Sequence, residues 1–564
     1  MTRTSRASLA LTAACATALT SAALLRAQGR GGGEWTTSGF DAQRTAWVRN
    51  DARLTKKAVE KGEFKFLWKA KFDNEARQLN SLTEPVLLDL LIGYRGFKTL
   101  AFVGGSADRV FAIDTDLARP YWTANLNYAA STGGPPPSSW ECPGGLMATP
   151  SRRTALAPSN FGGGFGGGGR RMSSTVGEPG KGAAVLSQTP PAPRPPTPPP
   201  TPPPQPRTGD AAAPAARAAS AVAPIPFGGV DPLYTMGSDG LLRTLRVSDG
   251  AETMPPMPFL PPSAKPSALI FVDGFVYTTT SNGCGTAPNA VWAIDLTTQE
   301  KDKRVVSWKT SGANVVGNAG PTFGTNGTLY VALGSAPSSA NAAPAAAAAS
   351  QSNAVVALDR HALTVKDWFT TEGTAFATSP IVIRYKDKDL IAAAASDGRL
   401  YLLDSASLGG ADHKMPLFVT PAGAATGSAL ATWDDGTTRW VLAAAANSVV
   451  AFKLVDAGGK LSLESAWKSR DLVSPLAPIV VNGLVMAASS GEFHAEASTP
   501  AAARAQKSTP AVLYVLDATS GKELWSSGTT ITSFARAGLS AGGGQVYLVT
   551  YDNQLYAFGI PMEH

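Results

Sequence analysis

The fold of this chain of 564 residues is decided by the stretch Leu513-Tyr-Val-Leu-Asp-Ala-Thr-Ser-Gly-Lys-Glu-Leu-Trp525. It contains a short apolar strand closed by an aspartate, a turn of small polar residues, and a second strand that ends on a tryptophan. Seven related apolar segments occur elsewhere in the chain: Val110–Asp114, Leu241–Leu245, Val291–Asp295, Val355–Asp359, Leu400–Asp404, Val449–Lys453 and Leu555–Gly559. A segment repeated at a spacing of roughly fifty residues is one supersecondary unit used many times.

The spacing of these segments becomes nearly regular once low-complexity insertions are allowed for. Their starts lie 131, 50, 64, 45, 49, 64 and 42 residues apart, and the three long gaps contain segments of biased composition. The largest, 160–227, includes twelve prolines within Thr189–Arg207. Such a composition cannot bury enough apolar surface to offset its ordering entropy, so we expect a disordered insert there. The shorter segments 336–352 and 492–510 have a similar composition and carry the same expectation.

Each repeat contains the signals of four short strands, with almost no helical periodicity. A strand that ends on an aromatic residue follows the aspartate, then a strand introduced by a proline, as in Thr83-Glu-Pro85, and then a β-rich strand closed by a turn. This order predicts an all-β, eight-bladed β-propeller over residues 34–560. The last segment, Leu555–Gly559, lacks the rest of its blade. We expect Phe66–Trp68, Glu84–Leu88 and Leu100–Val103 to complete it, which would close the ring by pairing the two ends of the chain.

The pattern from Leu513 to Trp525 resembles the pyrroloquinoline quinone (PQQ) repeat. The opening Trp35-Thr-Thr-Ser-Gly-Phe-Asp-Ala-Gln-Arg44 is similar to the Trp-x-x-x-Gly-x-Asp-x-x-Arg opening of quinoprotein dehydrogenases. The resemblance covers nearly all of 34–560 outside the inserts. The same repeat is shared by dehydrogenases, by an outer-membrane assembly lipoprotein and by other exported propellers. It implies that the tryptophans stack between neighbouring blades and that the aspartates shape turns.

Family dehydrogenases bind PQQ with calcium in the central funnel, where a disulfide between adjacent cysteines stacks on the quinone and an aspartate acts as the base. Here Cys142 and Cys284 are far apart in the sequence, and the chain has no Cys-x-x-Cys-His haem motif. The resemblance therefore implies the fold more directly than the activity.

The beginnings of the innermost strands face the central channel of a propeller, so we searched them for polar side chains. Arg77, Lys265, Asn318 and Arg536 are the candidate ligand-binding residues, and the cations among them could bind an acidic ligand. The oxygen-bearing residues Glu84, Glu141 and Asn318 are of a type that calcium prefers. The alternative is a solvated channel lined by ordinary polar side chains. We assign no catalytic residue and no metal site.

Export is indicated at the N-terminus. Arg3 and Arg6 precede an uncharged, alanine-rich stretch from Ala7 to Leu25, which predicts a signal peptide over 1–27 and a periplasmic or secreted protein. Lipoprotein processing at Cys15 is a variant of this hypothesis. Two cysteines then remain, Cys142 and Cys284, either as a disulfide or as two buried thiols. No second long apolar run follows, so we expect no transmembrane segment in the mature chain.

Charge and motifs exclude several classes of function. The formal net charge is +7, but residues 1–27 carry three arginines and residues 151–226 carry a net +6, which leaves the remaining chain near −2. A nucleic-acid-binding protein would have a basic surface, so we expect no such partner. The four histidines are dispersed, which disfavours a zinc or copper cluster, and no Gly-x-Ser-x-Gly motif is present.

Two functional hypotheses remain. The first is a monomeric, non-catalytic binding or scaffold protein of the cell envelope, whose funnel takes a small ligand or an envelope protein. The second is a divergent quinoprotein dehydrogenase that oxidises alcohols or sugars with PQQ and calcium. The proline run could be a ligand for a polyproline-binding partner or for the cell wall, or an inert tether.

Overall fold

The computed structural model describes residues 34–93, 96–126, 141–156, 231–298, 300–301, 304–336, 351–425, 429–494 and 499–562. They belong to one compact unit made of residues 1–162 and 230–564. The expected signal peptide 1–27, the expected insert 160–227 and most of 336–352 lie outside the described residues.

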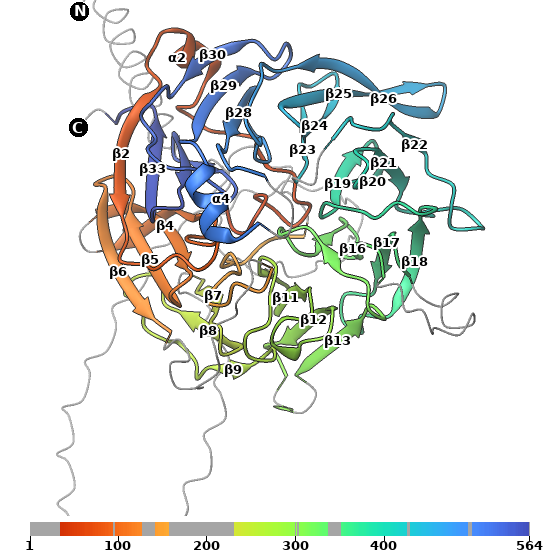
Figure 1. Ribbon diagram of the computed structural model, residues 1–564, viewed down its shortest axis with the longest axis horizontal. Helices are drawn as coiled ribbons and strands as arrows, with labels where there is room; N and C mark the ends of the chain where they lie inside the picture. Colours follow the sequence, from red (N-terminus) through yellow and green to blue (C-terminus); the bar gives the residue numbers. More distant parts are fainter. Residues whose placement is uncertain are drawn as a thin grey trace, which may run out of the picture. The chain divides into compact units, whose positions relative to one another are not determined.

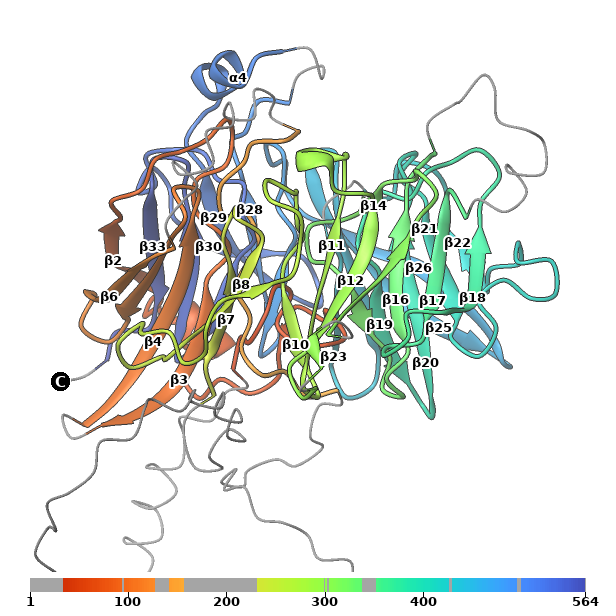
Figure 2. The same ribbon diagram turned by 90° about the horizontal axis from the view of Figure 1, so that it is seen from below.

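Eight β-sheets radiate from a common centre as the blades of a propeller (Figure 1). Figure 2 shows the strands of these blades from the side of the ring. The predicted fold class is therefore confirmed. From inner to outer strand, the blades are β3 (Val86–Gly93), β4 (Gly96–Gly105), β5 (Arg109–Asp114) and β6 (Arg119–Asn125); β7 (Leu233–Met236), β8 (Leu241–Leu245) and β9 (Met257–Pro258); β10 (Ile270–Val272), β11 (Phe275–Thr280), β12 (Ala290–Asp295) and β13 (Val305–Lys309); β14 (Val315–Val316) with β15 (Thr322–Phe323), β16 (Leu329–Leu333), β17 (Ala354–Leu358) and β18 (Val365–Thr370); β19 (Ile381–Tyr385), β20 (Lys388–Ala394), β21 (Leu400–Asp404) and β22 (Phe418–Val419); β23 (Ala431–Asp434), β24 (Arg439–Ala445), β25 (Ser448–Ala457) and β26 (Lys460–Lys468); β27 (Ile479–Val481), β28 (Leu484–Ser489), β29 (Val512–Asp517) and β30 (Glu523–Ser526); and β31 (Ser540–Gly542), β32 (Gln545–Val549), β33 (Gln554–Gly559) and β2 (Lys65–Lys71).

The repeated segment forms the third strand of nearly every blade, and these strands are buried on both faces. In the blade of β7, β8 and β9, the innermost strand is reduced to one bridge between Ser151 and Tyr234. The short helices are α2 (Lys56–Glu60), α4 (Ala501–Lys507) and the 3-10 turn η1 (Cys284–Thr286). No helix among the described residues is long and apolar enough to cross a membrane.

The ring is closed by the two ends of the chain, as expected, but with a different division of strands. β2 pairs antiparallel with β33, with Lys69 opposite Tyr556, and so supplies the outer strand of the last blade. The expectation that Glu84–Leu88 and Leu100–Val103 complete the same blade is wrong. These residues lie in or next to β3 and β4, which form a hairpin that continues into β5 and β6. Hairpins between consecutive strands need only short turns, and these pairings satisfy the strands locally.

An N-terminal plug, Trp35–Val48, lies across the central channel and bonds to one blade after another. Backbone carbonyls of the plug accept hydrogen bonds from backbone N–H groups of the blades, and the hydroxyl of Thr37 donates to the carbonyl of Leu269. In ring order, the partners are Leu87, Arg152, Leu269, Phe323, Val382, Thr432 and Val480. The plug ends as β1 (Trp47–Val48), which pairs parallel with β27. Seven of the eight blades are thus linked through one segment.

The tryptophans after the repeated segments dock onto the neighbouring blade. Trp122 Nε1 donates to the carbonyl of Val247 at 2.8 Å, and Trp467 Nε1 donates to that of Ala518 at 2.9 Å. A glycine with positive φ lies against each ring, and a Cβ on Gly521 would come within 2.5 Å of the Trp467 ring. The interpretation of these tryptophans as joints between blades is confirmed.

The aspartates of the repeat close the following turns. One oxygen of Asp517 accepts the backbone N–H groups of Thr519 and Ser520 together with their hydroxyls. These bonds satisfy the turn after the strand locally, as an Asx turn does. The aspartates are structural, as the resemblance implied.

The expected disorder of 492–510 is wrong for the part that the structure describes. Residues 501–507 form α4, which stands out from one face of the ring (Figure 2). Arg504 of α4 is buried and donates to Glu492, and Ala501 packs in a small cluster with Leu79 and Phe534. Alanine-rich segments have high helix propensity, and here a buried ion pair attaches the helix to the ring.

Candidate functional site

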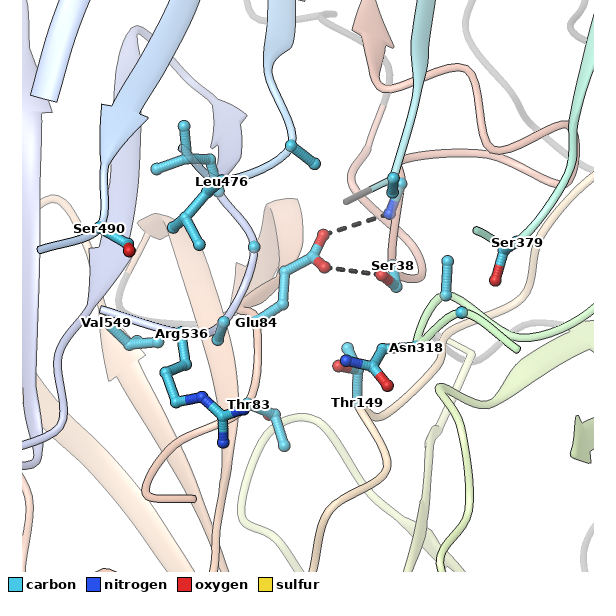
Figure 3. Close-up of a pocket in the computed structure, with 18 of the residues that line it drawn as sticks. Ser38, Thr83, Glu84, Thr149, Asn318, Ser379, Leu476, Ser490, Arg536 and Val549 are labelled. Atoms are coloured by element: carbon cyan, nitrogen blue, oxygen red, sulfur yellow. Dashed lines mark hydrogen bonds between the residues drawn. The ribbon is translucent and has the colours of Figure 1, made fainter. Parts of the chain in front are cut away.

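A cavity of about 750 Å³ occupies the centre of the ring. The plug residues Trp35, Ser38, Gly39, Arg44 and Ala46 form part of its lining, and the beginnings of the inner strands and their loops form the rest. A cavity of this size accommodates a small organic molecule. Figure 3 shows a close-up of its lining.

Glu84 is buried beside the plug, and both of its oxygens are engaged. Oε1 accepts the indole N–H of Trp35 at 2.8 Å and the backbone N–H of Gly39 at 3.2 Å, while Oε2 accepts the hydroxyl of Ser38 at 2.7 Å (Figure 3). Burial raises the pKa of the Glu84 carboxyl, against the lowering effect of these hydrogen bonds and of Arg44. Glu84 therefore holds the plug in place.

Arg44 is buried at the end of the quinoprotein-like opening and serves the same structural purpose. Its Nη1 donates to the hydroxyl of Thr37 at 2.7 Å, and its Nε donates to the carbonyl of Pro321 at 3.1 Å. Burial lowers the pKa of Arg44 to about 10, although Glu84 and Asp41 act in the opposite direction. The conformation of the opening is thus fixed by hydrogen bonds within the plug and to the inner ends of the blades.

Lys265 lines the cavity in the segment before β10. Among the described residues its ammonium has neither a hydrogen bond nor an ion pair. Burial lowers the pKa of Lys265, and the positive charge of Arg536 lowers it further, whereas Glu141 raises it. A partly buried cation without a partner is unfavourable in the empty cavity.

Arg536 enters the cavity from the segment before β31 (Figure 3), and its side chain is oriented by Glu492. Its Nε donates to Glu492 Oε2 at 3.0 Å, and Arg504 Nη2 donates to Glu492 Oε1 at the same distance. The side chain of Glu492 is 6% exposed and that of Arg536 is 29% exposed. One buried carboxylate thus holds two arginines, of which only Arg536 reaches the cavity.

Asn318 and Ser379 contribute further polar groups to the cavity wall (Figure 3). Asn318 is exposed to the cavity, and its backbone carbonyl accepts the N–H of Ala268. The hydroxyl of Ser379 is buried without a hydrogen-bond partner in the part of the chain that the structure describes. Three of the four candidate ligand-binding residues, Lys265, Asn318 and Arg536, therefore share one cavity.

Arg77 does not belong to the lining of the cavity. Its backbone pairs with that of Asn80, and a Cβ on Gly145 would lie 3.1 Å from its side chain. Its charge acts on Asp108 and lowers the pKa of that carboxyl, which burial raises to about 6. Arg77 thus lies next to the cavity rather than in it, because its segment turns back on itself at Asn80.

Cys142 and Cys284 are joined in a disulfide, with 5.4 Å between their Cα atoms. The preceding residue, Glu141, is exposed, and its carbonyl accepts the side-chain amide of Asn282. A Cβ on Gly285 would touch the backbone of Pro262 and Ser263. The disulfide therefore connects the loop at Glu141 to a turn that packs just before Lys265.

The oxygen-bearing candidates for calcium do not form a set of free ligands. Asn318 lines the cavity together with Glu84, but both oxygens of Glu84 accept hydrogen bonds from the plug, and Glu141 is exposed and outside the lining. No group of three or more His, Cys, Asp or Glu side chains suited to a metal ion occurs among the described residues. Calcium in proteins takes six to eight oxygen ligands. The residues present do not fit the PQQ and calcium site that the resemblance implies.

No protein-family model and no curated protein matches this chain. Several solved structures match it over most of its length. The quinohemoprotein alcohol dehydrogenase from Comamonas testosteroni is 13% identical, with 96% of this chain and 82% of that chain covered and a TM-score of 0.53. The quinohemoprotein alcohol dehydrogenase ADHIIG from Pseudomonas putida HK5 is 11% identical, with 94% and 81% covered and a TM-score of 0.54.

A europium-containing methanol dehydrogenase is 10% identical, with 93% of this chain and 98% of that chain covered and a TM-score of 0.52. At this level of identity the likeness concerns the fold alone. The chain shares the eight-bladed propeller fold with these structures.

Sequence reasoning missed Glu492 and Arg504, although both anchor the mouth of the cavity. They lie in or beside a segment of biased composition, where a charged residue looks like part of a solvated insert. The sequence offers one indication of this ion pair, since Glu492 and Arg504 lie twelve residues apart in an otherwise alanine-rich stretch. Trp35 and Ser38 were read as part of a family motif, and their hydrogen bonds to Glu84 span 49 and 46 residues.

Proposed function

We propose that this protein is an exported, non-catalytic binding protein that takes a small organic ligand into its central cavity. The observation that carries the proposal is the shared cavity of Lys265, Asn318 and Arg536, which offers these polar groups around about 750 Å³ of space. Ligand sites are concave and have a few polar groups that fix orientation. Lys265, Asn318 and Arg536 are the contact residues.

The engagement of Glu84 supports binding rather than quinoprotein chemistry. A carboxylate whose two oxygens hold the plug cannot also coordinate calcium without breaking those bonds. The likeness to alcohol dehydrogenases favours the competing function, a divergent PQQ-dependent dehydrogenase, because this fold hosts that chemistry in its neighbours. A shared fold does not by itself imply a shared activity.

One experiment separates the two functions. The chain without residues 1–27 is incubated with PQQ and calcium, and quinone absorbance is measured after gel filtration, together with dye reduction by a panel of alcohols and aldoses. We expect neither retention nor turnover. Stoichiometric retention with turnover would instead establish the dehydrogenase.

Binding in the cavity is tested by filling part of the cavity with a bulky side chain. Asn318→Trp places a bulky ring in the cavity from an exposed position, whereas Lys309→Trp places the same ring on the outer strand β13. In a thermal-shift screen of small organic compounds, we expect the ligands that stabilise the wild-type chain to stabilise Lys309→Trp equally and to lose their effect on Asn318→Trp. Equal shifts in both variants would locate binding outside the cavity.

A further inference from the structure

The chemical class of the ligand can be read from the polar groups of the cavity, on the basis of the function proposed above. We infer that the ligand is an organic anion, and that its acidic group binds between Lys265 and Arg536. The two side chains line the same cavity and come from the segments before β10 and β31.

The first argument is charge. Lys265 and Arg536 line the same cavity, and the charge of Arg536 acts on the pKa of Lys265. The carboxylate of Glu492 is bound by Arg536 and by Arg504, so its charge is already shared by two arginines. Glu141 acts on Lys265 from an exposed position, where solvent weakens its effect. An incoming anion meets an excess of positive charge at this place.

The second argument is the number of free donors. Arg536 donates through Nε to Glu492, and no described residue accepts a hydrogen bond from its Nη1 or Nη2. The ammonium of Lys265 likewise has no acceptor among the described residues. A carboxylate or phosphate group carries several acceptor oxygens and forms charge-assisted hydrogen bonds with such donors. A neutral ligand would leave these donors without a charged partner.

The third argument is the orientation of Arg536. Its guanidinium is held by Glu492, which also lines the cavity and is itself bound by Arg504 of α4. A donor that is already oriented loses little freedom when it binds a ligand. Elsewhere apolar side chains such as Leu82, Leu476 and Val549 share the wall with polar ones such as Asn318 and Ser379, so the body of the ligand has both apolar and polar parts.

The test compares acids with neutral analogues of the same shape. The probes are benzoate with benzamide, glutarate with glutaramide, and inorganic phosphate, each up to about 10 mM, a range that detects millimolar dissociation constants. Binding to the mature chain is measured by titration calorimetry and thermal shift. We expect at least one acid to bind, and to bind about tenfold or more tightly than its amide, since charged hydrogen bonds are lost in the amide. Phosphate binding without carboxylate binding would assign the same pair of cations to a phosphorylated ligand.

Variants show whether Lys265 and Arg536 are responsible. Lys265→Met and Arg536→Gln are each expected to weaken acid binding about tenfold or more, as removal of a charged donor does. Lys309→Met, on the outer strand of the same blade as Lys265, is the matched control and should bind as the wild-type chain does. Far-UV circular dichroism and the melting temperature establish that each variant is folded.

The outcomes keep this inference apart from the proposed function. Amides that bind as tightly as their acids, acids that bind equally well to Lys265→Met and Arg536→Gln, or no acid binding at all would overturn the inference. If neutral compounds bind and Asn318→Trp abolishes that binding, the cavity is a binding site for a neutral ligand and the proposed function stands. If neither class binds, both fail.

Discussion

The indole N–H of Trp35 donates a hydrogen bond of 2.8 Å to Oε1 of Glu84, and both side chains are buried. This bond attaches the plug to the segment before β3, whereas the sequence offered Glu84 only as a polar side chain of the channel, of a type that calcium prefers. The buried acceptor and the buried donor depend on each other, because neither has water as an alternative partner.

Replacement of Glu84 tests this dependence. Glu84→Gln retains an acceptor for Trp35 and Gly39 and gains a donor for Ser38, so we expect a loss of about 1 kcal/mol or less. Glu84→Leu leaves the indole N–H and the hydroxyl of Ser38 without acceptors, at about 1–3 kcal/mol each. Urea denaturation followed by tryptophan fluorescence measures both. Equal stability of the Leu variant and the wild-type chain would contradict the role of Glu84 in the plug.

Asp89 in β3 predicts an unusual dependence of stability on pH. It is buried, and neither of its oxygens has a hydrogen-bond partner among the described residues. Burial raises its pKa well above the ordinary value; Glu34 and Asp51 raise it too, and Arg152 opposes them. A group whose pKa is higher in the folded state adds stability below its unfolded pKa, and that stability is lost as the pH rises through the folded pKa.

We therefore expect the wild-type chain to lose stability relative to Asp89→Asn as the pH rises above the ordinary pKa of an aspartate and through the raised pKa of Asp89. The measurement is the urea midpoint of both chains at each pH, and only the difference between the two curves is used. Asp412→Asn, at an exposed position, is the control. Parallel curves for Asp89→Asn and the wild-type chain would show that Asp89 ionises normally.

The ion pair between Glu492 and Arg504 predicts a large stability loss on truncation. Their side chains are 6% and 4% exposed. Glu492→Ala leaves Arg504 as a buried charge without its carboxylate, and breaking a buried pair in this way costs about 3–5 kcal/mol. The exposed pair of Arg470 and Glu523 is the control, since Glu523→Ala should change stability by less than about 1 kcal/mol. Similar melting temperatures for the two variants would argue against a structural role of Glu492.

The disulfide predicts the absence of free thiols and a contribution to stability. Thiol titration of the unfolded chain without residues 1–27, and without reductant, should detect none. Cys142→Ser with Cys284→Ser opens a link between residues 142 positions apart, and links over loops of this length stabilise by about 2–5 kcal/mol. Calorimetry of the double variant and of the wild-type chain under reducing conditions should give matching melting temperatures. Two thiols per unfolded chain would rule the disulfide out.

The architecture was predictable because it rests on a repeated local pattern. Strand periodicity recurs in every blade, turn residues equivalent to Asp517 recur in most, and the count of segments equals the count of sheets. Lys265, Asn318 and Arg536 were found by the same logic, since the starts of inner strands face the channel in any propeller. The predictable features, namely the strands of a blade, the number of blades and the residues at the starts of the inner strands, are those that each repeat determines by itself.

The functions of Glu84 and Glu492 could not be predicted, because they depend on partners that only the closed ring brings together. Nothing near Glu84 in the sequence indicates that Trp35 and Ser38 satisfy its oxygens. The composition around Ala501 predicted disorder, but the buried ion pair of Arg504 with Glu492 attaches this segment to the ring as a helix. The division of strands at the closure also depends on tertiary pairing, which places β2 next to β33 on the side opposite β32.

The long-range contacts of the plug restrict when it can reach its final position during synthesis of the chain. Trp35–Val48 leaves the ribosome before any blade, yet its partners extend from Leu87 to Val480. The earliest part of the described chain can therefore be seated fully only when nearly the whole polypeptide has been made. Contacts between residues so distant in sequence form slowly. The plug is therefore the first described part of the chain to be translated, but it can make its contacts with β27 only late in synthesis.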